Sequence, residues 1–574
     1  MKYIKAFAKF VYPFIKIQLL LLVFIIISTA ISLAPPYALK VLIDNCIPNK
    51  DLDLLYKIGE ILLLVYLARS GINHLNAHYS TLIYNKIGDN IRRTLFNNMI
   101  LQPYEYFENN TQGNLVQKIN FEVSKIQSFL SNVMISFINN LFLVVGVSFM
   151  LAITNKLLFL LYLSVFPIPF LINLFFNKKI KKLIKESSIL EGDLFNFYID
   201  KIKNISLIKS YNSISIENER LKEQLSTIFS NIKSRSVFGS LSGNLSGLFI
   251  SIGPLLILMV GGYQAILGNL TIGAVVAFIQ YSNRLTPPLN GIIGIHLEYS
   301  QVLISMKHIY PLLVLKEEDK NELGKSSLFI KNIVKIDINK LTFVRDEKPV
   351  IKDLCFKFEQ GTSYAIVGEN GSGKSTLLKI LCGFYTPTEG TILVNNEHSL
   401  SDLNDNSWLD NIAVVFQEPL ILNDSILSNI SYGSIVPVIE KVWDALDTVG
   451  LANFVKNLPN GLLTIYGDGE NELKMSGGQR QLLALARALY RDRSVLILDE
   501  ATSAVDTKNE EQILIKIKEK YKNKIVIFVS HRLSTIKNLD RIGVMANGLI
   551  LEEGKHADLL SNTSHYRSIF QSQF

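Results

Sequence analysis

The sequence predicts a multidomain membrane protein, in which an all-α transmembrane domain of six helices precedes an α/β P-loop domain. Two observations support this prediction. The chain is 48% hydrophobic, and its long uncharged runs are concentrated in residues 1–310. A glycine-rich loop at residues 368–376 then lies between a strand-like run and a helix-like run.

Four uncharged runs are the strongest candidates for membrane spans. Each is long enough, as a helix, to cross the roughly 30 Å of hydrocarbon in a bilayer. These runs are Ile17–Ala34, Ile135–Ile153, Leu157–Phe176 and Val237–Leu267.

Two further candidates contain charged residues. Leu54–Ile72 carries three charges, among them Arg69, and Ile272–Ile295 carries Arg284. With these two the chain is expected to cross the membrane six times within a domain of residues 1–315. The expected spans lie at about residues 17–37, 54–75, 133–153, 157–177, 237–264 and 271–295.

The connections between the spans predict the orientation. Those at about 75–133 and 177–236 are long and helical in composition, and about thirty helical residues reach roughly 45 Å. Lysines are concentrated just after the fourth span, at Lys178, Lys179, Lys181, Lys182 and Lys185. Because positive charge accumulates on the inner side, we expect both termini and the P-loop domain to be cytoplasmic, in a multi-pass protein of the cell membrane.

Composition gives little sign of other partners. The formal net charge of +8 fits the inner-face lysines of a membrane protein, and no basic segment is interleaved with aromatic residues, so no nucleic acid is expected. The three cysteines, Cys46, Cys355 and Cys382, form no metal-binding or disulfide pattern.

The P-loop follows the strand-like run Ser363–Val367 and opens a helix at Ser375. Its glycines allow backbone N–H groups to face phosphate oxygens. Lys374 is expected to reach the outer phosphates of ATP, and the Ser375 hydroxyl to bind Mg²⁺. The expected ATP-binding loop comprises Gly368, Glu369, Asn370, Gly371, Ser372, Gly373, Lys374, Ser375 and Thr376.

A second apolar run, Ser494–Leu498, ends in Asp499 and Glu500. A carboxylate at such a strand end can hold Mg²⁺, and its neighbour can polarise an attacking water. We therefore assign Asp499 to Mg²⁺ and Glu500 to the general base, against the alternative of a solvated acidic pair. The two segments together indicate a nucleotide triphosphatase.

The segment Met475–Gln479 resembles the signature sequence of ATP-binding-cassette (ABC) ATPases. Three more positions match this family in the same order: Gln417 its glutamine loop, Asp506 its aspartate loop, and His531 its switch histidine. Residues 467–470 resemble the short element that precedes the signature in exporters. The resemblance covers about residues 336–574, after an expected linker at 316–335.

This resemblance implies a head-to-tail dimer with two ATP molecules between the subunits. Gln417 would sense Mg²⁺ and the attacking water, and His531 would hold the γ-phosphate. Since all motifs are intact in one chain, a homodimer is expected. The signature residues Ser476, Gly477, Gly478 and Gln479, with Asp506, would complete the ATP site of the partner.

One position departs from the family. An aromatic residue usually follows two positions after Phe343 and stacks on adenine, but Arg345 stands there. A guanidinium plane can also stack on a base. Arg345 is therefore a candidate base-stacking residue, with weakened adenine selectivity as a consequence.

The N-terminal half is similar to the membrane half of ABC exporters. Residues 106–113 and 204–211 resemble the segments around the two coupling helices of that family, with Asn204 where glycine is usual. In the family these helices dock on the ATPase domain and transmit its closure to the membrane helices.

Polar residues inside the expected spans are candidates for a cargo cavity. Arg69 and Arg284 fall near mid-bilayer depth, where charges usually face a cavity or a partner. They suggest an anionic or zwitterionic cargo, such as a peptide carboxylate or a lipid headgroup; alternatively, the arginines bond backbone carbonyls. The remaining candidates are Ser240, Asn244, Gln280 and Tyr281.

The expected function is ATP-driven export of an amphipathic peptide, lipid or drug by a homodimer with alternating access. A lipid flippase of the same fold cannot be distinguished from an exporter of peptides or drugs by these residues. An ATP-gated channel or sensor and an importer are the less favoured alternatives, because the expected catalytic residues are intact and the chain has the exporter plan.

Overall fold

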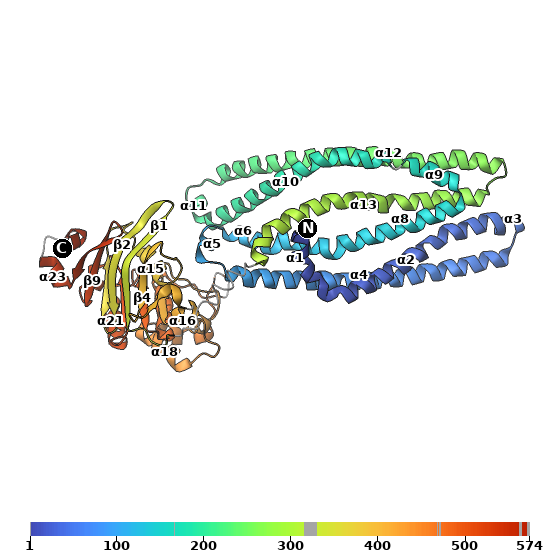
Figure 1. The fold of residues 1–574 in the computed structure, drawn as a ribbon. Coiled ribbons are helices and arrows are strands. Elements are labelled where there is room, and N and C mark those ends of the chain that lie inside the picture. The colour runs from blue at the N-terminus through green and yellow to red at the C-terminus, as the bar shows by residue number, and fades with distance from the viewer. Residues whose placement is uncertain are drawn as a thin grey trace. The chain divides into compact units, whose positions relative to one another are not determined.

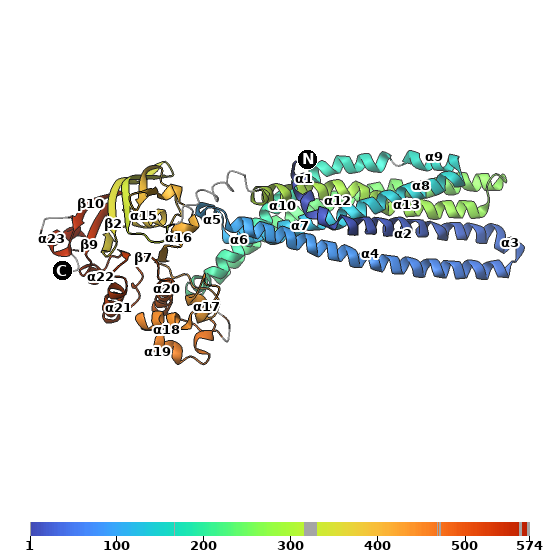
Figure 2. The same cartoon turned by 60° about the horizontal axis from the view of Figure 1, so that its bottom comes forward.

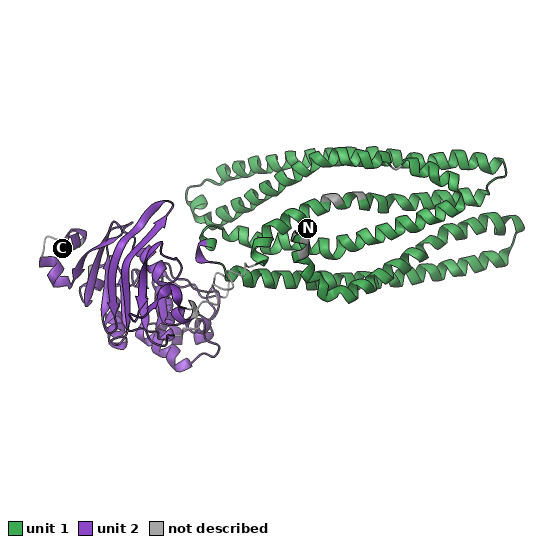
Figure 3. Ribbon diagram, in the orientation of Figure 1, with its two compact units in different colours: residues 1–102, 106–315 green, residues 103–105, 316–574 purple. Residues whose placement is uncertain are grey.

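The computed structural model describes residues 2–165, 167–314, 330–403, 405–467, 469, 472–561 and 565–570. The chain forms two compact units (Figure 3). Unit 1 comprises Met1–Gln102 and Tyr106–Leu315, and unit 2 comprises Pro103–Glu105 and Lys316–Phe574. Residues 316–329 of the expected linker, and Asp468 and Glu470 of the element before the signature, lie outside the described residues.

Unit 1 is built from long helices that run alongside one another (Figures 1 and 2). The principal helices are α1 (Lys2–Val11), α2 (Ile15–Val41), α4 (Leu52–Ile100), α8 (Met134–Thr154), α9 (Lys156–Val165), α10 (Pro167–Lys203), α12 (Ile214–Ile266) and α13 (Ile272–Leu313). Shorter helices connect them: α3 (Ile47–Asn49), α5 (Tyr104–Glu108), α6 (Gln112–Gln117), α7 (Val123–Ser128) and α11 (Ile205–Ser210). A 3₁₀ turn occupies Tyr12–Phe14, and π-helical turns occupy Leu42–Cys46, Lys118–Glu122 and Phe129–Val133.

Four helical segments among the described residues are long and apolar enough to cross a membrane. They are Ala6–Asn49, Gln112–Thr154, Lys156–Lys203 and Ile214–Ile266. The other two expected spans lie in α4 and α13, whose stretches are more polar and do not reach the same apolarity. Six crossings therefore remain a prediction, while unit 1 has the helical, apolar character that the sequence indicated.

Two apolar clusters hold unit 1 together. In one, Ile83 and Ile87 of α4 pack with Phe7 of α1, Ile126 of α7 and Met306 of α13. Since residues three to four apart share one face of a helix, the isoleucines of α4 form a continuous buried stripe.

The second cluster packs α8 and α9 against α12 and α13, with Tyr162 and Phe278 at its centre. The Tyr162 hydroxyl donates to the Ser282 carbonyl at 2.9 Å. Because hydrocarbon offers the backbone no other partner, such side-chain bonds fix one helix on the next.

Unit 2 is an α/β domain with two sheets. The antiparallel sheet has the order β2-β1-β4-β5, and the larger sheet has the order β10-β9-β3-β8-β7-β6. The strands are β1 (Lys335–Arg345), β2 (Lys348–Glu359), β3 (Ser363–Val367), β4 (Glu389–Val394), β5 (His398–Ser399), β6 (Ile412–Val415), β7 (Val495–Asp499), β8 (Ile525–Val529), β9 (Arg541–Ala546) and β10 (Leu549–Gly554). The helices are α15 (Lys374–Leu381), α16 (Asp405–Leu409), α17 (Ile426–Ile430), α18 (Ile439–Thr448), α19 (Ala452–Lys456), α20 (Gly477–Arg491), α21 (Thr507–Lys520), α22 (Leu533–Ile536), α23 (His556–Ser561) and α24 (His565–Phe570).

The centre of the larger sheet is parallel and buried on both faces. Strands β3, β8 and β7 are neighbours, and nearly all of their residues are buried. This is why they appear in the sequence as continuous apolar runs rather than alternating ones. Unit 2 also includes Pro103–Glu105, and the Tyr104 ring stacks on Phe384 with centroids 4.5 Å apart.

Candidate nucleotide-binding site

The ends of three neighbouring parallel strands bring the expected catalytic residues together. The loop beginning at Gly368 follows β3, Asp499 and Glu500 lie at the end of β7, and His531 follows β8. Because parallel strands place their carboxyl ends at one edge of the sheet, these segments meet there.

The P-loop wraps around its own lysine. Lys374 is 7% exposed, and its ammonium group donates to the carbonyls of Gly368 and Glu369, at 2.8 Å each. Burial lowers the pKa of Lys374, against the opposing effect of the carboxylates of Glu500 and Asp499. A Cβ atom on Gly368 would lie 2.0 Å from the Met545 carbonyl oxygen, so only glycine fits there.

The outer residues of the loop remain accessible. Glu369, Asn370, Gly371 and Ser375 are exposed, while Ser372 and Gly373 are buried. Gly373, with a φ of 105°, is the N-cap of α15 and is followed by Lys374 and Ser375 in its first turn. The first turn of this helix thus presents free backbone N–H groups beside an exposed hydroxyl, an arrangement suited to phosphate.

Asp499 and Glu500 differ in their surroundings. Burial, reinforced by the charge of Glu500, raises the pKa of Asp499 to about 6. Glu500 has a left-handed backbone with a φ of 47°. Its carboxylate accepts from Gln417 Nε2 at 3.0 Å and lies 3.6 Å from His531 Nε2.

His531 is half-buried beside these groups. Burial is the largest cause that lowers the pKa of His531, and the positive charge of Lys374 lowers it further. The imidazole is therefore neutral near pH 7. A cavity of about 150 Å³ adjoins it and is lined in part by Glu500, Ser503 and Arg532.

The signature residues begin α20 at the surface of unit 2. Ser476 accepts from the Gln479 N–H while the Gln479 side chain accepts from the Ser476 N–H, which forms a capping box. Ser476 and Gly477 are exposed, and nothing lies within 4 Å of a Cβ built on Gly477. In the described part of the chain, no hydrogen bond joins Ser476–Gln479 to the loop 368–376.

The segment 503–506 packs behind the signature helix. A Cβ on Gly478 would lie 2.8 Å from the Ala504 carbonyl oxygen, and Asp506 caps α21 by accepting from the Asn509 N–H. Gln481, 5% exposed, bonds both the Ser503 hydroxyl and the Ala504 N–H, at 2.8 Å each.

The sequence did not single out Gln481, nor the buried Glu510 and its half-buried partner Arg532. Glu510 is 1% exposed, accepts from Thr502 and Thr535, and pairs with Arg532 at 3.2 Å. Arg532 in turn donates to the carbonyls of Ser503 and Val505. The sequence signal that could have pointed to Arg532 was its position directly after the expected switch histidine, His531.

Arg345 is held by a residue that the sequence analysis did not name. One of its guanidinium nitrogens, Nη1, donates to the Tyr385 hydroxyl at 2.8 Å, and the guanidinium carbon lies 5.7 Å from the centroid of the Tyr385 ring. That ring stacks on Phe343, with centroids 5.0 Å apart. Arg345 is therefore anchored at the tip of the β1–β2 hairpin.

Within unit 1, Arg284 has a backbone partner. Its guanidinium donates to the Ser32 carbonyl of α2. Pro36, four residues after Ser32, has no N–H to offer that carbonyl. Arg284 thus satisfies a group that the proline leaves free, as in the alternative interpretation given above for these arginines.

Arg69 differs from Arg284. Its Nε is buried and has no hydrogen-bond partner among the described residues, and its charge acts on the neighbouring Arg284. Tyr281, 1% exposed, donates to the Leu33 carbonyl at 2.7 Å and so belongs to the packing of α2 against α13. The remaining cargo candidates, Ser240, Asn244 and Gln280, are exposed on the surface of unit 1.

The polar residues of α12 that pack inside unit 1 are not the predicted Ser240 and Asn244. Ser242 and Ser246, both buried, bond Asn173 of α10 at 3.2 and 3.0 Å, and were not predicted. Elsewhere on α12, nothing lies within 4 Å of a Cβ built on Gly239 or Gly243. Glycines at this spacing suit a close contact between helices, and no such contact is made there within the described chain.

Comparison with known families and proteins agrees with this architecture. The model of the ABC transporter transmembrane region matches residues 19–289, and the ABC transporter model matches residues 351–503. The chain is 28% identical over 559 residues to the ATP-dependent lipid A-core flippase of Syntrophus aciditrophicus (strain SB), covering 96% of this chain and 91% of the relative.

It is also 29% identical over 581 residues to a putative multidrug export ATP-binding/permease protein of Staphylococcus aureus (strain Mu50), covering 99% and 100%. Its fold is similar to that of an ATP-bound bacterial Atm1-family ABC exporter, with a TM-score of 0.87, 22% identity and 98% of each chain covered.

The predicted fold class is thereby confirmed: a helical transmembrane domain is fused to a nucleotide-binding domain with the motifs of an ATPase. The chain belongs to the ABC exporter family of ABC transporters and is a multi-pass, ATP-hydrolysing half-transporter.

Proposed function

We propose that this half-transporter works as a homodimer in the cell membrane, with its termini and ATPase units in the cytoplasm. It hydrolyses Mg²⁺–ATP at two shared sites and exports an anionic amphiphile. The observation that carries the proposal is the contact of Gln417 and His531 with one carboxylate, that of Glu500, beside the P-loop.

The described oxygen donors suit Mg²⁺, which prefers hard oxygen ligands. The Ser375 hydroxyl is exposed, Asp499 supplies a carboxylate, and Gln417 keeps its amide oxygen because its nitrogen is bonded to Glu500. Bound there, Mg²⁺ would neutralise charge developing on the phosphates.

The residues of the chain have separate tasks in hydrolysis. Glu500 takes the proton of the attacking water, and Gln417 orients that carboxylate. Neutral His531 donates to the terminal phosphate, and Lys374 leaves its loop carbonyls to bind the outer phosphates. ATP binding and hydrolysis then alternate the access of the cargo cavity between the two sides of the membrane.

Surface features support a second copy as the partner. Ser476 and Gly477 are exposed and form no hydrogen bond to the P-loop among the described residues, which supports a second chain as the source of the signature at each ATP. In unit 1, the exposed Ser240 and Asn244 lie beside the uncovered Gly239 and Gly243. A polar, small-residue face of a spanning helix is stabilised by another helix rather than by lipid.

The cargo class follows from an imbalance of charge. Arg69 and Arg284 are neighbours, and the described residues offer no ion pair to either. Two positive charges at low dielectric repel each other, and a bound anion removes the penalty. An amphipathic anion, whether a lipid, a peptide carboxylate or a drug, satisfies both the charge and the apolar helix surfaces.

A lipid flippase is the second candidate, favoured by the 28% identical relative that is named a lipid A-core flippase. The name of the other relative, a putative multidrug exporter, is equally compatible with an amphiphile. A gated channel or sensor is less favoured because the Glu500–His531 pair is intact, and an importer is less favoured because of the exporter fold.

The test uses the full chain in proteoliposomes, with fluorescent phosphatidylglycerol and phosphatidylcholine, and with one hydrophobic peptide as its free acid and its amide. We expect ATP-dependent transport, and stimulated ATPase, for the anionic lipid or the free acid, and loss of both with Arg69→Gln. Lys57→Gln, on the exposed surface of the same helix, is the matched control.

Each outcome assigns the function. Transport of the anionic lipid alone identifies a flippase, and transport of the peptide acid alone identifies a peptide exporter. Equal stimulation by charged and neutral partners would overturn the anionic cargo, while flux that persists in Glu500→Gln would favour a gated channel.

A further inference from the structure

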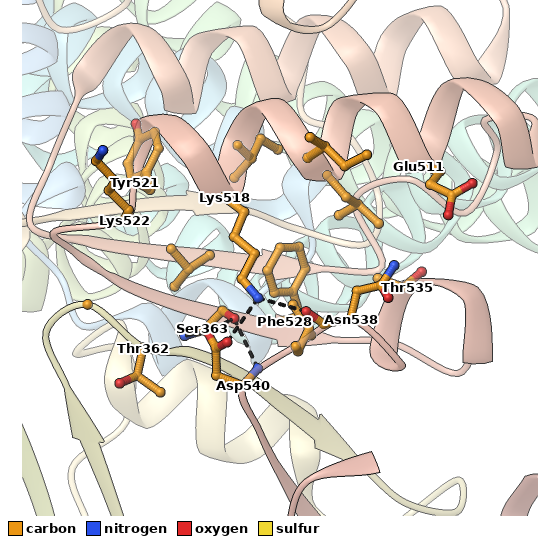
Figure 4. Close-up of a pocket in the computed structure, with 16 residues that line it drawn as sticks. Thr362, Ser363, Glu511, Lys518, Tyr521, Lys522, Phe528, Thr535, Asn538 and Asp540 are labelled. Atoms are coloured by element: carbon orange, nitrogen blue, oxygen red, sulfur yellow. Dashed lines mark hydrogen bonds and ion pairs between the residues drawn. The ribbon is translucent and has the colours of Figure 1, made fainter. Parts of the chain in front are cut away.

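A second cavity of unit 2 lies away from the P-loop, beneath α21 (Figure 4). Its volume of about 210 Å³ gives room for a small organic molecule, and it opens to solvent beside the exposed Glu511 and Lys522. It lies between α21, β8, the start of β3 at Ser363 and the segment 535–540.

The walls of this cavity are mainly apolar. Leu514 and Ile517 of α21 face it from one side, and Val526, Phe528 and Leu539 from the sheet and the following segment. An apolar molecule bound there removes these walls from water and gains dispersion contacts with them, so an apolar occupant of matching size is favoured.

The polar groups on its floor are satisfied. Lys518 points into the cavity and donates to Asp540 at 2.9 Å, and the Ser363 hydroxyl and N–H also bond Asp540 (Figure 4). These groups form a closed set and leave little charge for a ligand.

One cation at the rim remains. Glu511 is paired with Lys537 at 3.9 Å, whereas Lys522 is exposed and forms no ion pair within the described chain. The rim therefore carries one uncompensated positive charge, which favours an anionic group at that end.

The cavity shares a wall with the catalytic edge of the sheet. Phe528 and Thr535 line both this cavity and the one beside Glu500 and His531. The Thr535 hydroxyl donates to buried Glu510 at 2.6 Å.

Glu510 connects Thr535 to the segment that follows Asp499 and Glu500. It holds Arg532 at 3.2 Å, and Arg532 bonds the carbonyls of Ser503 and Val505. A displacement of Thr535 is thus transmitted to residues 503–505 through groups that are in direct contact.

We propose that the cavity beneath α21 is a regulatory site for a small organic anion with an aromatic or branched apolar body. The occupant fills the space against Leu514 and Phe528, places its anionic group near Lys522, and slows hydrolysis by displacing Thr535 from Glu510. This inference rests on the ATPase activity of the chain and is independent of the cargo.

The experiment uses the full chain in nanodiscs, with 2-naphthoate as the probe and neutral 2-naphthamide as its matched partner; empty nanodiscs give the background. Binding is measured by equilibrium dialysis, and ATPase by phosphate release. We expect both compounds to bind, naphthoate several-fold more tightly, and kcat to fall at least twofold with little change in KM for ATP.

Variants separate the binding step from the coupling step. Leu514→Trp fills the cavity and should abolish binding of both compounds; Leu514→Phe is the milder substitution if thermal unfolding shows that the tryptophan is not accommodated. Lys522→Gln should remove only the preference for naphthoate. Thr535→Val should keep binding but lose the ATPase response, while Thr535→Ser keeps both.

Two results overturn the proposal. Absence of binding above the empty-nanodisc background, or binding that survives both Leu514 substitutions, removes the site. Binding without any change in kcat in the unsubstituted chain removes its regulatory role. Because cargo transport is not measured, neither result bears on the export function.

Discussion

Glu500 occupies a backbone conformation that few residues other than glycine adopt. Its φ of 47° lies in the left-handed region, where a non-glycine residue costs on the order of 1–3 kcal/mol. The conformation is held because the Glu500 N–H donates to the Val529 carbonyl of the neighbouring strand, at 2.9 Å. This turn places the carboxylate next to Gln417 and His531 rather than along the strand.

Replacing Glu500 with Gln should abolish turnover while leaving ATP binding intact. The amide has nearly the same shape but cannot take a proton, and a general base typically contributes about 10²–10⁴ in rate. Steady-state phosphate release and binding of a fluorescent ATP analogue measure the two effects. Glu519→Gln, on the exposed face of α21, is the control; normal hydrolysis in Glu500→Gln would refute the assignment.

Mg²⁺-dependent ATP binding should weaken in mild acid. Because burial and the charge of Glu500 raise the pKa of Asp499 to about 6, its carboxyl gains a proton as the pH falls through that value. A protonated carboxyl is a poor metal ligand. We expect the Mg²⁺-dependent part of the affinity to fall between pH 7 and pH 5, with binding in EDTA much less affected.

Titrations of ATP at each pH, with Mg²⁺ or with EDTA, measure this difference. In Asp499→Asn the Mg²⁺-dependent part should already be weak at pH 7 and should lose its pH dependence. An unchanged Mg²⁺ effect at pH 5 in the unsubstituted chain would contradict the prediction.

Arg345 should set the relative affinity for adenine and guanine nucleotides. Replacing Arg345 with Tyr restores an aromatic ring, and stacking of that kind contributes about 0.5–1.5 kcal/mol. ATP should therefore bind about 2–10-fold more tightly relative to GTP. Competition between the two nucleotides gives the ratio, and Arg345→Lys, which keeps the charge without the plane, is the control. The same ratio in both variants would exclude Arg345 from the base site.

The sequence predicted the residues that belong to contiguous motifs. Lys374, Glu500 and His531 could be named as candidates because a loop, a strand end and an ordered set of segments mark them in the sequence. Tyr385, Gln481 and Glu510 were not identified, because their contacts join residues 22 to 40 positions apart in the sequence. Only the fold brings such pairs together.

At the scale of single elements, the bond between Arg284 and α2 is open to a direct test. Pro36 leaves the Ser32 carbonyl without a helical donor, and Arg284 donates to it. Arg284→Gln should lower the thermal unfolding midpoint in nanodiscs by several degrees, because an unsatisfied carbonyl in an apolar setting is costly.

Pro36→Ala supplies the missing N–H, so the same substitution should cost less in that background. Scanning calorimetry or dye-based unfolding of the four proteins gives the coupling energy of the double-mutant cycle. Equal costs with and without the proline would show that Arg284 does not act through the Ser32 carbonyl.

Element boundaries were predicted less well than element types. The sequence predicted a membrane span at about 54–75 followed by a connection of helical composition, but not that both belong to one unbroken helix, α4, from Leu52 to Ile100. Hydropathy reports the surroundings of a helix and not its hydrogen bonding, so a helix that leaves the membrane shows no end there. The π-helical turns at Lys118–Glu122 and Phe129–Val133 likewise were not predicted from the sequence.

At the scale of the whole molecule, complementation tests the proposed sharing of sites. Lys374→Ala disables the P-loop, and Gly477→Asp places a carboxylate in the signature, where it would repel phosphate. Each variant alone should be inactive, since both sites of its homodimer are broken. A mixed dimer keeps one P-loop facing one intact signature.

Co-expressed variants with two different affinity tags should therefore recover a measurable fraction of ATPase activity in the doubly purified dimer. The measurement is phosphate release relative to each single variant. Activity that stays at the level of the single variants, with mixed dimers present, would show that the two segments do not complete one site across the subunits.

The bonds of Gln481 to Ser503 and Ala504 have one more consequence. They link α20, the helix that begins with the signature, to the segment that follows Glu500. A displacement of either segment would therefore shift the other. In a two-fold dimer, nucleotide bound at one ATP site would then change the geometry of the residues at the other ATP site. Hydrolysis at one ATP site would then depend on the state of the other, whether the two sites act alternately or together.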